Sequence, residues 1–168
     1  MPDPVRWQWP FSASKWIEER ESLKDRFEAF ITGVTVCYKY IQRIKSLEMT
    51  ELGLKGTHVT CLFYLSNHPG GLTAAQLCQL CAEDKASVSR TVADLRSRGY
   101  IAPSERHYRT PLKLTEEGRQ AAQKMEPLIQ RWVQSGGDGL TDAQREVFYK
   151  SLAMIGENLR SRLEEDEK

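Results

Sequence analysis

The chain has 168 residues, of which 40% are hydrophobic and 28% charged, enough to bury the core of one folded domain. Its 24 Lys and Arg residues nearly balance 23 Asp and Glu residues, so the formal net charge is +1. No run approaches the roughly 18 apolar residues of a membrane span, and the start lacks the pattern of a secretion signal. Four cysteines are too few for a disulfide-built fold. We therefore expect a cytoplasmic protein with reduced thiols and no membrane partner.

The first half of the chain is predicted to form helices separated by short breaks. Residues 14–47 place apolar side chains at steps of three and four, which predicts a long amphipathic helix in one or two pieces. A shorter helix is predicted over residues 58–67, and it ends at the turn signal of residues 67–71.

Two short helices joined by a tight turn are predicted next. Thr73 followed by Gln76 is a capping-box pattern that begins one helix, and Asp84 is placed to cap another over residues 85–98. This second helix is expected to bury an apolar face and to turn a polar face outward. The expected apolar residues are Val88, Val92 and Leu95, and the expected polar ones are Ser87, Arg90, Thr91 and Asp94.

The rest of the chain predicts a hairpin followed by two helices. Residues 100–102 and 112–114 are short β-like runs joined through residues 103–111. A helix resumes at Thr115, with a kink expected at Pro127. The last helix begins at a second capping box and carries an apolar stripe of Val147, Phe148, Leu152, Ile155, Leu159 and Leu163. The predicted fold is mainly α with a small β-hairpin wing, a winged helix-turn-helix between long terminal helices.

Three ordered runs carry a resemblance to a known family: LTAAQL at 72–77, DKASVSRTVADLRSRGYI at 84–101 and LKLTEEG at 112–118. Together they resemble the MarR family of bacterial transcription regulators. The resemblance implies a homodimer with interdigitating terminal helices, a recognition helix in the major groove of double-stranded DNA and a wing at the minor groove. It also implies, in many members, a small-molecule effector. The expected domains are an extension with a dimerisation helix (1–52), the DNA-binding domain (53–118) and C-terminal dimerisation helices (119–168).

Charge placement favours DNA binding independently of the resemblance. Residues 85–113 hold seven basic and two acidic residues, a net charge of +5, which is the footprint expected for phosphate contact. Ser87, Ser89 and Arg90 match the family's Thr/Ser-x-Ser/Thr-Arg stretch, whose side chains reach bases or phosphates, and Lys85 is a candidate phosphate contact. The alternative is that the serines only cap the helix and the charges only face solvent.

The hairpin departs from the family pattern. Typical members have a longer tip with an Asp-x-Arg motif, whereas this chain has SERHYR at 104–109. Arg106 and Arg109 remain candidates for contact with phosphates or the minor groove. We interpret His107 as a bystander on the turn, with a pH-sensitive contact as the alternative.

The cysteines suggest a second chemistry, because Cys78 and Cys81 form a C-x-x-C pattern and some relatives sense oxidants or metals through thiols. Both lie within a predicted helix beside leucines, and the three histidines do not complete a four-ligand site. We interpret them, and Cys37, as buried small apolar residues, with redox sensing and metal binding as alternatives. No metal is predicted.

Aromatic residues suggest an effector pocket. Tyr38, Tyr64 and Trp132 are candidates to line the site that the resemblance places between the first, second and fifth helices, with core or dimer packing as the alternative. A further aromatic group is interpreted as extra dimer contact: Trp7, Trp9, Phe11 and Trp16.

No catalytic triad, phosphate-binding glycine loop or paired-carboxylate site is recognisable, so we expect neither an enzyme nor a cofactor. The expected function is that of a sequence-specific transcription regulator, a repressor, acting as a homodimer on a pseudo-palindromic operator. The alternative is a winged-helix interaction or assembly module without an operator. The sequence leaves open whether the output is repression or activation.

Overall fold

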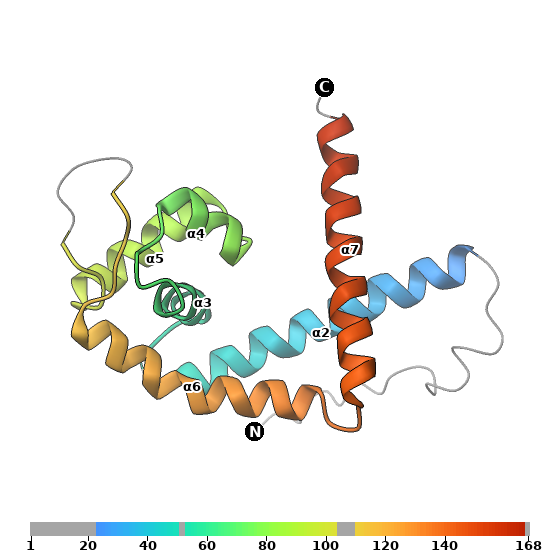
Figure 1. The fold of residues 1–168 in the computed structure, drawn as a ribbon, viewed down its shortest axis with the longest axis horizontal. Helices are drawn as coiled ribbons and strands as arrows, with labels where there is room; N and C mark the ends of the chain where they lie inside the picture. The colour runs from blue at the N-terminus through green and yellow to red at the C-terminus, as the bar shows by residue number, and fades with distance from the viewer. Residues whose placement is uncertain (1–22, 51–52, 104–109, 167–168) are drawn as a thin grey trace, which may run out of the picture.

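The computed structural model describes residues 23–50, 53–103 and 110–166, and within them the protein is almost entirely helical (Figure 1). The helices in these ranges are α2 (Leu23–Thr50), α3 (Gly56–Ser66), α4 (Ala74–Cys81), α5 (Lys85–Ser97), α6 (Glu116–Gly136) and α7 (Asp142–Asp166). The order agrees with the helices predicted from residue 23 onward. No helix in the described ranges has the length and apolar character needed to cross a membrane.

The helix starts follow from local side-chain caps. Thr73 begins α4 by accepting a hydrogen bond from the Gln76 amide at 3.3 Å, while the Gln76 side chain accepts one from the Thr73 amide at 2.9 Å. Thr141 and Gln144 repeat the same pair of bonds at the start of α7. Each box satisfies two amides that would otherwise lack partners. Both predicted capping boxes are confirmed.

The core lies where α3, α4, α5 and the first half of α6 meet, at one end of the molecule (Figure 1). Each of these helices, together with the segment after α5, contributes a large side chain that is almost fully buried: Leu62, Leu77, Leu95, Ile101 and Met125. Such burial stabilises by roughly 1.5–3 kcal/mol per side chain. This core fixes α5 relative to its neighbours.

A glycine brings α6 against the segment that follows α5. A Cβ atom at Gly118 would lie 2.1 Å from the carbonyl oxygen of Tyr100, so no larger residue fits without a shift of backbone. Further along, α6 continues through Pro127 without interruption, and Figure 1 shows its axis changing direction between its two halves, in line with the expected kink.

The helices α2 and α7 extend away from the core (Figure 1). Their predicted apolar stripes are present, but most of the stripe residues are exposed within one protomer: Phe27, Ile31, Val34, Tyr38 and Ile41 on α2, and Val147, Phe148, Leu152, Leu159 and Leu163 on α7. No described side chain of α7 is buried. The predicted burial of Cys37 is wrong, because that side chain of α2 is exposed.

The base of the predicted hairpin is present as isolated antiparallel bridges. Ile101 pairs with Leu114, and Leu112 pairs with Leu72 ahead of α4. The Ala102 amide donates to the Lys113 carbonyl at 2.9 Å, and the Thr115 amide donates to the Tyr100 carbonyl at 3.0 Å. Residues 104–109 lie outside the described ranges, so the wing itself stays a prediction.

Candidate nucleic-acid interface

The turn between α4 and α5 is three residues long. Ala82 takes a left-handed conformation, with φ of 51°, and closes α4. Asp84 then accepts a hydrogen bond from the Ser87 amide at 2.7 Å and caps α5, as predicted. These local contacts hold the two helices in a helix-turn-helix arrangement.

The outward face of α5 is defined by its exposed residues, which recur at helical spacing: Lys85, Ala86, Ser89, Arg90, Ala93 and Ser97. Small side chains on both sides of Arg90 leave room for a partner surface to approach. The opposite face is buried, as expected for Val88, Val92 and Leu95. Thr91 corrects the prediction: it is only 6% exposed, because it lies next to Val92 on the inward side.

The predicted DNA-contacting residues of α5 are thus not equivalent. Arg90 and Ser89 lie on the outward face, and Lys85 is exposed at the helix start, whereas Ser87 is half-buried at the cap. Among the described residues, none forms a hydrogen bond or ion pair with the Arg90 guanidinium. A cation held on a solvated surface without an internal partner is available to a nucleic acid.

Asp94 faces the protein rather than Arg90. Its Oδ2 atom lies 2.9 Å from Nε2 of His58 on α3 and 3.2 Å from Nε of Arg98. Asp94 therefore joins α5 to α3 through His58 and forms no i, i+4 ion pair with Arg90. The negative charge of Asp94 on α5 is offset within the protein by Arg98.

His58 was not recognised from the sequence as part of this site. Its side chain is only 2% exposed; Nδ1 accepts a hydrogen bond from the Lys55 amide at 3.0 Å while Nε2 donates to Asp94. Burial lowers the pKa of His58, and this outweighs the opposing effect of Asp94. The neutral ring is the form that can accept at Nδ1 and donate at Nε2. The sequence signal that could have indicated this contact is the position of His58, three residues after Lys55 at the start of a helix.

The remaining basic residues divide between described and undescribed parts of the chain. Arg96 is partly buried, Arg98 is held by Asp94, and Lys113 is exposed beside the hairpin base. Arg106 and Arg109 lie outside the described residues, as does His107. Their proposed contacts remain sequence-based.

The three candidate effector residues lie on three different helices. Tyr38 is exposed on α2, Tyr64 packs against the core from α3, and the Trp132 indole of α6 donates to Glu48 of α2 at 2.9 Å. The Trp132–Glu48 bond joins α6 to α2. Tyr64 and Trp132 pack against the core, which is the alternative that the sequence left open for these aromatic residues.

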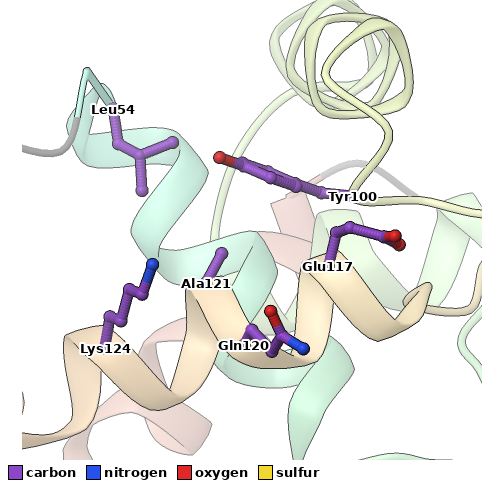
Figure 2. Close-up of a pocket in the computed structure, with 6 residues that line it drawn as sticks. All are labelled: Leu54, Tyr100, Glu117, Gln120, Ala121 and Lys124. Carbon is purple, nitrogen blue, oxygen red and sulfur yellow. The ribbon is translucent and has the colours of Figure 1, made fainter.

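Two pockets lie beside α6. One, of about 240 Å³, is lined by Leu54, Tyr100, Glu117, Gln120, Ala121 and Lys124. Figure 2 shows the Tyr100 hydroxyl directed toward Leu54, with Lys124 and Glu117 at opposite ends. The other, of about 390 Å³, lies between α3 and α6. Neither is lined by Tyr38, Tyr64 or Trp132.

The cysteines of the C-x-x-C pattern both lie on α4 and are partly buried, and Cys61 of α3 is buried. Cys81 lies next to Cys61, with 3.7 Å between the sulfur atoms. No group of three or more His, Cys, Asp or Glu side chains that could hold a metal ion is found among the described residues.

Comparison with known proteins agrees with this architecture. The MarR family sequence profile matches residues 52–109, a range that includes α3, α4 and α5. Among curated proteins, no relative matches the chain.

Solved structures share the fold. A MarR-family transcriptional regulator from Silicibacter pomeroyi is 21% identical, with a TM-score of 0.71 over 83% of this chain and 96% of that one. A MarR transcriptional regulator from Methanosarcina mazei Go1 is 21% identical, with a TM-score of 0.70 over 80% and 91%. BpsR of Bordetella bronchiseptica, whose DNA binding is regulated by 6-hydroxynicotinic acid, is 20% identical, with a TM-score of 0.64 over 88% and 99%. The mainly helical fold predicted from the sequence is confirmed.

Proposed function

We propose that the chain, whose residues 52–109 match the MarR family profile, is a MarR-like transcription regulator that binds double-stranded DNA as a homodimer. The site of contact is the outward face of α5. The observation that carries the proposal is the exposed Arg90, which has no internal partner among the described residues and lies within the segment of net charge +5. Arginine binds O6 and N7 of guanine through two hydrogen bonds, so it reads sequence as well as charge.

The other α5 residues have supporting roles. Ser89 lies beside Arg90 on the outward face and is a second base or phosphate contact. Lys85 is exposed at the helix start, where a cation reaches the phosphate backbone. Ser87 donates its backbone amide to the cap residue Asp84 and offers a half-buried hydroxyl as a further contact. Arg106 and Arg109 add phosphate contacts from the wing.

The homodimer is supported by the uncovered apolar faces of α2 and α7. These long helices expose large apolar side chains, including Phe27 and Phe148, that a monomer would leave in water. Packing against a second copy would bury them and place the two α5 helices on one side of the dimer. We infer half-sites about 34 Å apart in a pseudo-palindromic operator, which is about 10 base pairs, or a multiple of that spacing.

The regulatory output follows from occupancy of that operator. A dimer that covers an operator overlapping a promoter excludes RNA polymerase, so we propose repression. We further propose that a small molecule lowers the affinity for DNA, as 6-hydroxynicotinic acid regulates the DNA binding of BpsR. Tyr38, Tyr64 and Trp132 remain its proposed contacts, and the dimer supplies the second surface that one protomer lacks.

The test is selection of bound sequences from a random duplex pool, followed by gel-shift measurements on the selected duplex and on a scrambled one. The proposal expects an enriched inverted repeat bound at least about a thousandfold more tightly than scrambled DNA. Arg90→Ala should remove this preference, whereas Arg131→Ala, an exposed arginine on α6, should keep it. Equal, weak binding to all duplexes would instead support an interaction module without an operator.

A further inference from the structure

Two cysteines from separate helices lie in contact beneath the helix-turn-helix. Cys61 is on α3 and Cys81 is the last residue of α4, and their sulfur atoms are 3.7 Å apart. Cys61 is only 2% exposed, while Cys81 is partly exposed. The pair brought together is therefore not the Cys78–Cys81 pattern that the sequence suggests.

The two thiols have unequal acidities. Either thiol can donate the hydrogen bond between the two sulfur atoms; when Cys81 ionises, the more buried Cys61 is the donor. This bond lowers the pKa of Cys81, and the ammonium of Lys45 favours the thiolate further, against burial and the charge of Glu83. The same bond, followed by burial, raises the pKa of Cys61. Lys45 is held near this pair by donating to Thr60 at 3.2 Å.

We propose that Cys61 and Cys81 are an oxidation site at which hydrogen peroxide forms an intramolecular disulfide that weakens DNA binding. The Cys81 thiolate attacks one peroxide oxygen, the O–O bond breaks, and hydroxide leaves to become water on taking a proton. The Cys81 sulfenic acid is then attacked by the Cys61 sulfur. The S–O bond breaks, and hydroxide leaves as water with the Cys61 proton. Two thiols lose two electrons, and one peroxide is reduced to two waters.

The bond would strain the turn that leads into α5. A disulfide has an S–S length of about 2.05 Å, so the sulfur atoms must approach by roughly 1.7 Å. Cys61 is fixed in the core, whereas Cys81 ends α4 and is followed by the left-handed Ala82 and by the α5 cap Asp84. The required movement therefore falls on the helix-turn-helix turn. The effect on DNA rests on the proposed function.

The disulfide is measured first, without DNA. The reduced full chain is treated with hydrogen peroxide, blocked with a thiol alkylating reagent and mapped by mass spectrometry without reduction. Trypsin leaves Cys61, Cys78 and Cys81 in one peptide of residues 56–85, because no Lys or Arg lies between its ends. Chymotrypsin is therefore used to separate them. We expect a link between Cys61 and Cys81 that survives in Cys78→Ser and is lost in Cys81→Ser. A link through Cys37 or Cys78, or oxidation of Cys81 to a sulfinic acid without a link, overturns the proposal.

DNA binding is then compared between the reduced and oxidised forms on the selected operator. Oxidation should weaken binding about tenfold or more in the wild type and in Cys78→Ser, and dithiothreitol should restore it. Cys81→Ser should bind equally well before and after peroxide. A disulfide that leaves affinity unchanged overturns the regulatory inference while the proposed function stands. Reduced protein that binds no operator refutes the proposed function and leaves the disulfide result intact.

Discussion

Replacing Arg90 with alanine removes the guanidinium from the outward face of α5 and should leave the fold unchanged. Arg90 is exposed and has no partner among the described side chains, so its removal leaves no buried group unsatisfied. Surface changes of this kind usually alter stability by less than about 0.5 kcal/mol. Any loss of DNA binding in the variant would therefore be a direct effect on the interface.

The size of the loss depends on what Arg90 touches. A bidentate contact to guanine contributes about 1–3 kcal/mol of discrimination. A homodimer loses two such contacts, about 2–6 kcal/mol, and since about 1.4 kcal/mol is tenfold, operator affinity should fall between about 30-fold and about 20,000-fold. Binding to scrambled DNA should fall far less, so the specificity ratio decreases. A phosphate clamp would weaken both duplexes alike and leave the ratio constant.

The assay is a fluorescence-anisotropy titration of wild type, Arg90→Ala and Arg131→Ala on operator and scrambled duplexes, with thermal midpoints recorded for each. Asp94→Ala is the informative second variant. It should lower stability by about 1–3 kcal/mol, because the buried Nε2 of His58 loses its acceptor. Unchanged affinity of Arg90→Ala for both duplexes would remove Arg90 from the interface and refute the assignment of the α5 outward face.

Four other measurements test the remaining structure. Acidification below about pH 6.5, the ordinary pKa of histidine, should lower the thermal midpoint. The pKa of His58 is lowered in the folded protein, so its contribution to stability is complete above the pKa of the unfolded state and is lost as the pH falls toward the pKa of the folded state. His58→Gln should flatten this dependence of the thermal midpoint on pH, whereas the same change at the exposed His68 should not. Gly118→Ala should cost about 1–3 kcal/mol of unfolding free energy in chemical denaturation, because its Cβ meets Tyr100, while Gly136→Ala, which has open space, should not destabilise. Sedimentation at micromolar concentration should give a dimer, and Phe148→Glu should shift it toward monomer; a monomeric wild type would contradict the apolar-face argument. Arg106→Ala or Arg109→Ala should weaken all DNA sequences alike and reduce the salt dependence by about one counterion, whereas a base-specific loss would indicate minor-groove reading.

The features predicted correctly are those set by neighbouring residues. The capping boxes at Thr73 and Thr141 span four residues each, so their hydrogen bonds depend on local backbone geometry alone. The buried face of α5 follows from its helical period, and Thr91 was misplaced because it lies near the edge of that face, where a hydroxyl gives no clear preference.

The features that were missed depend on how helices pack. The His58–Asp94 contact joins residues 36 positions apart, and the Cys61–Cys81 contact joins residues 20 apart. Periodicity indicates which face of each helix is buried, but not which residue of one helix meets which residue of another. Cys37 shows the converse, because its apolar side of α2 is uncovered within a single protomer. Periodicity placed Cys37 among apolar neighbours on α2, but it could not show whether another part of the same chain packs there.

The hydrogen bond from Trp132 to Glu48 gives the protein an internal optical probe. The chain has four tryptophans, and the other three, Trp7, Trp9 and Trp16, lie together near its start. A variant with those three replaced by phenylalanine would retain one indole, bonded to a carboxylate where α6 meets α2. The emission wavelength of Trp132 responds to that carboxylate and to water. A shift in wavelength on adding DNA or a small molecule would therefore report directly on movement between α6 and α2.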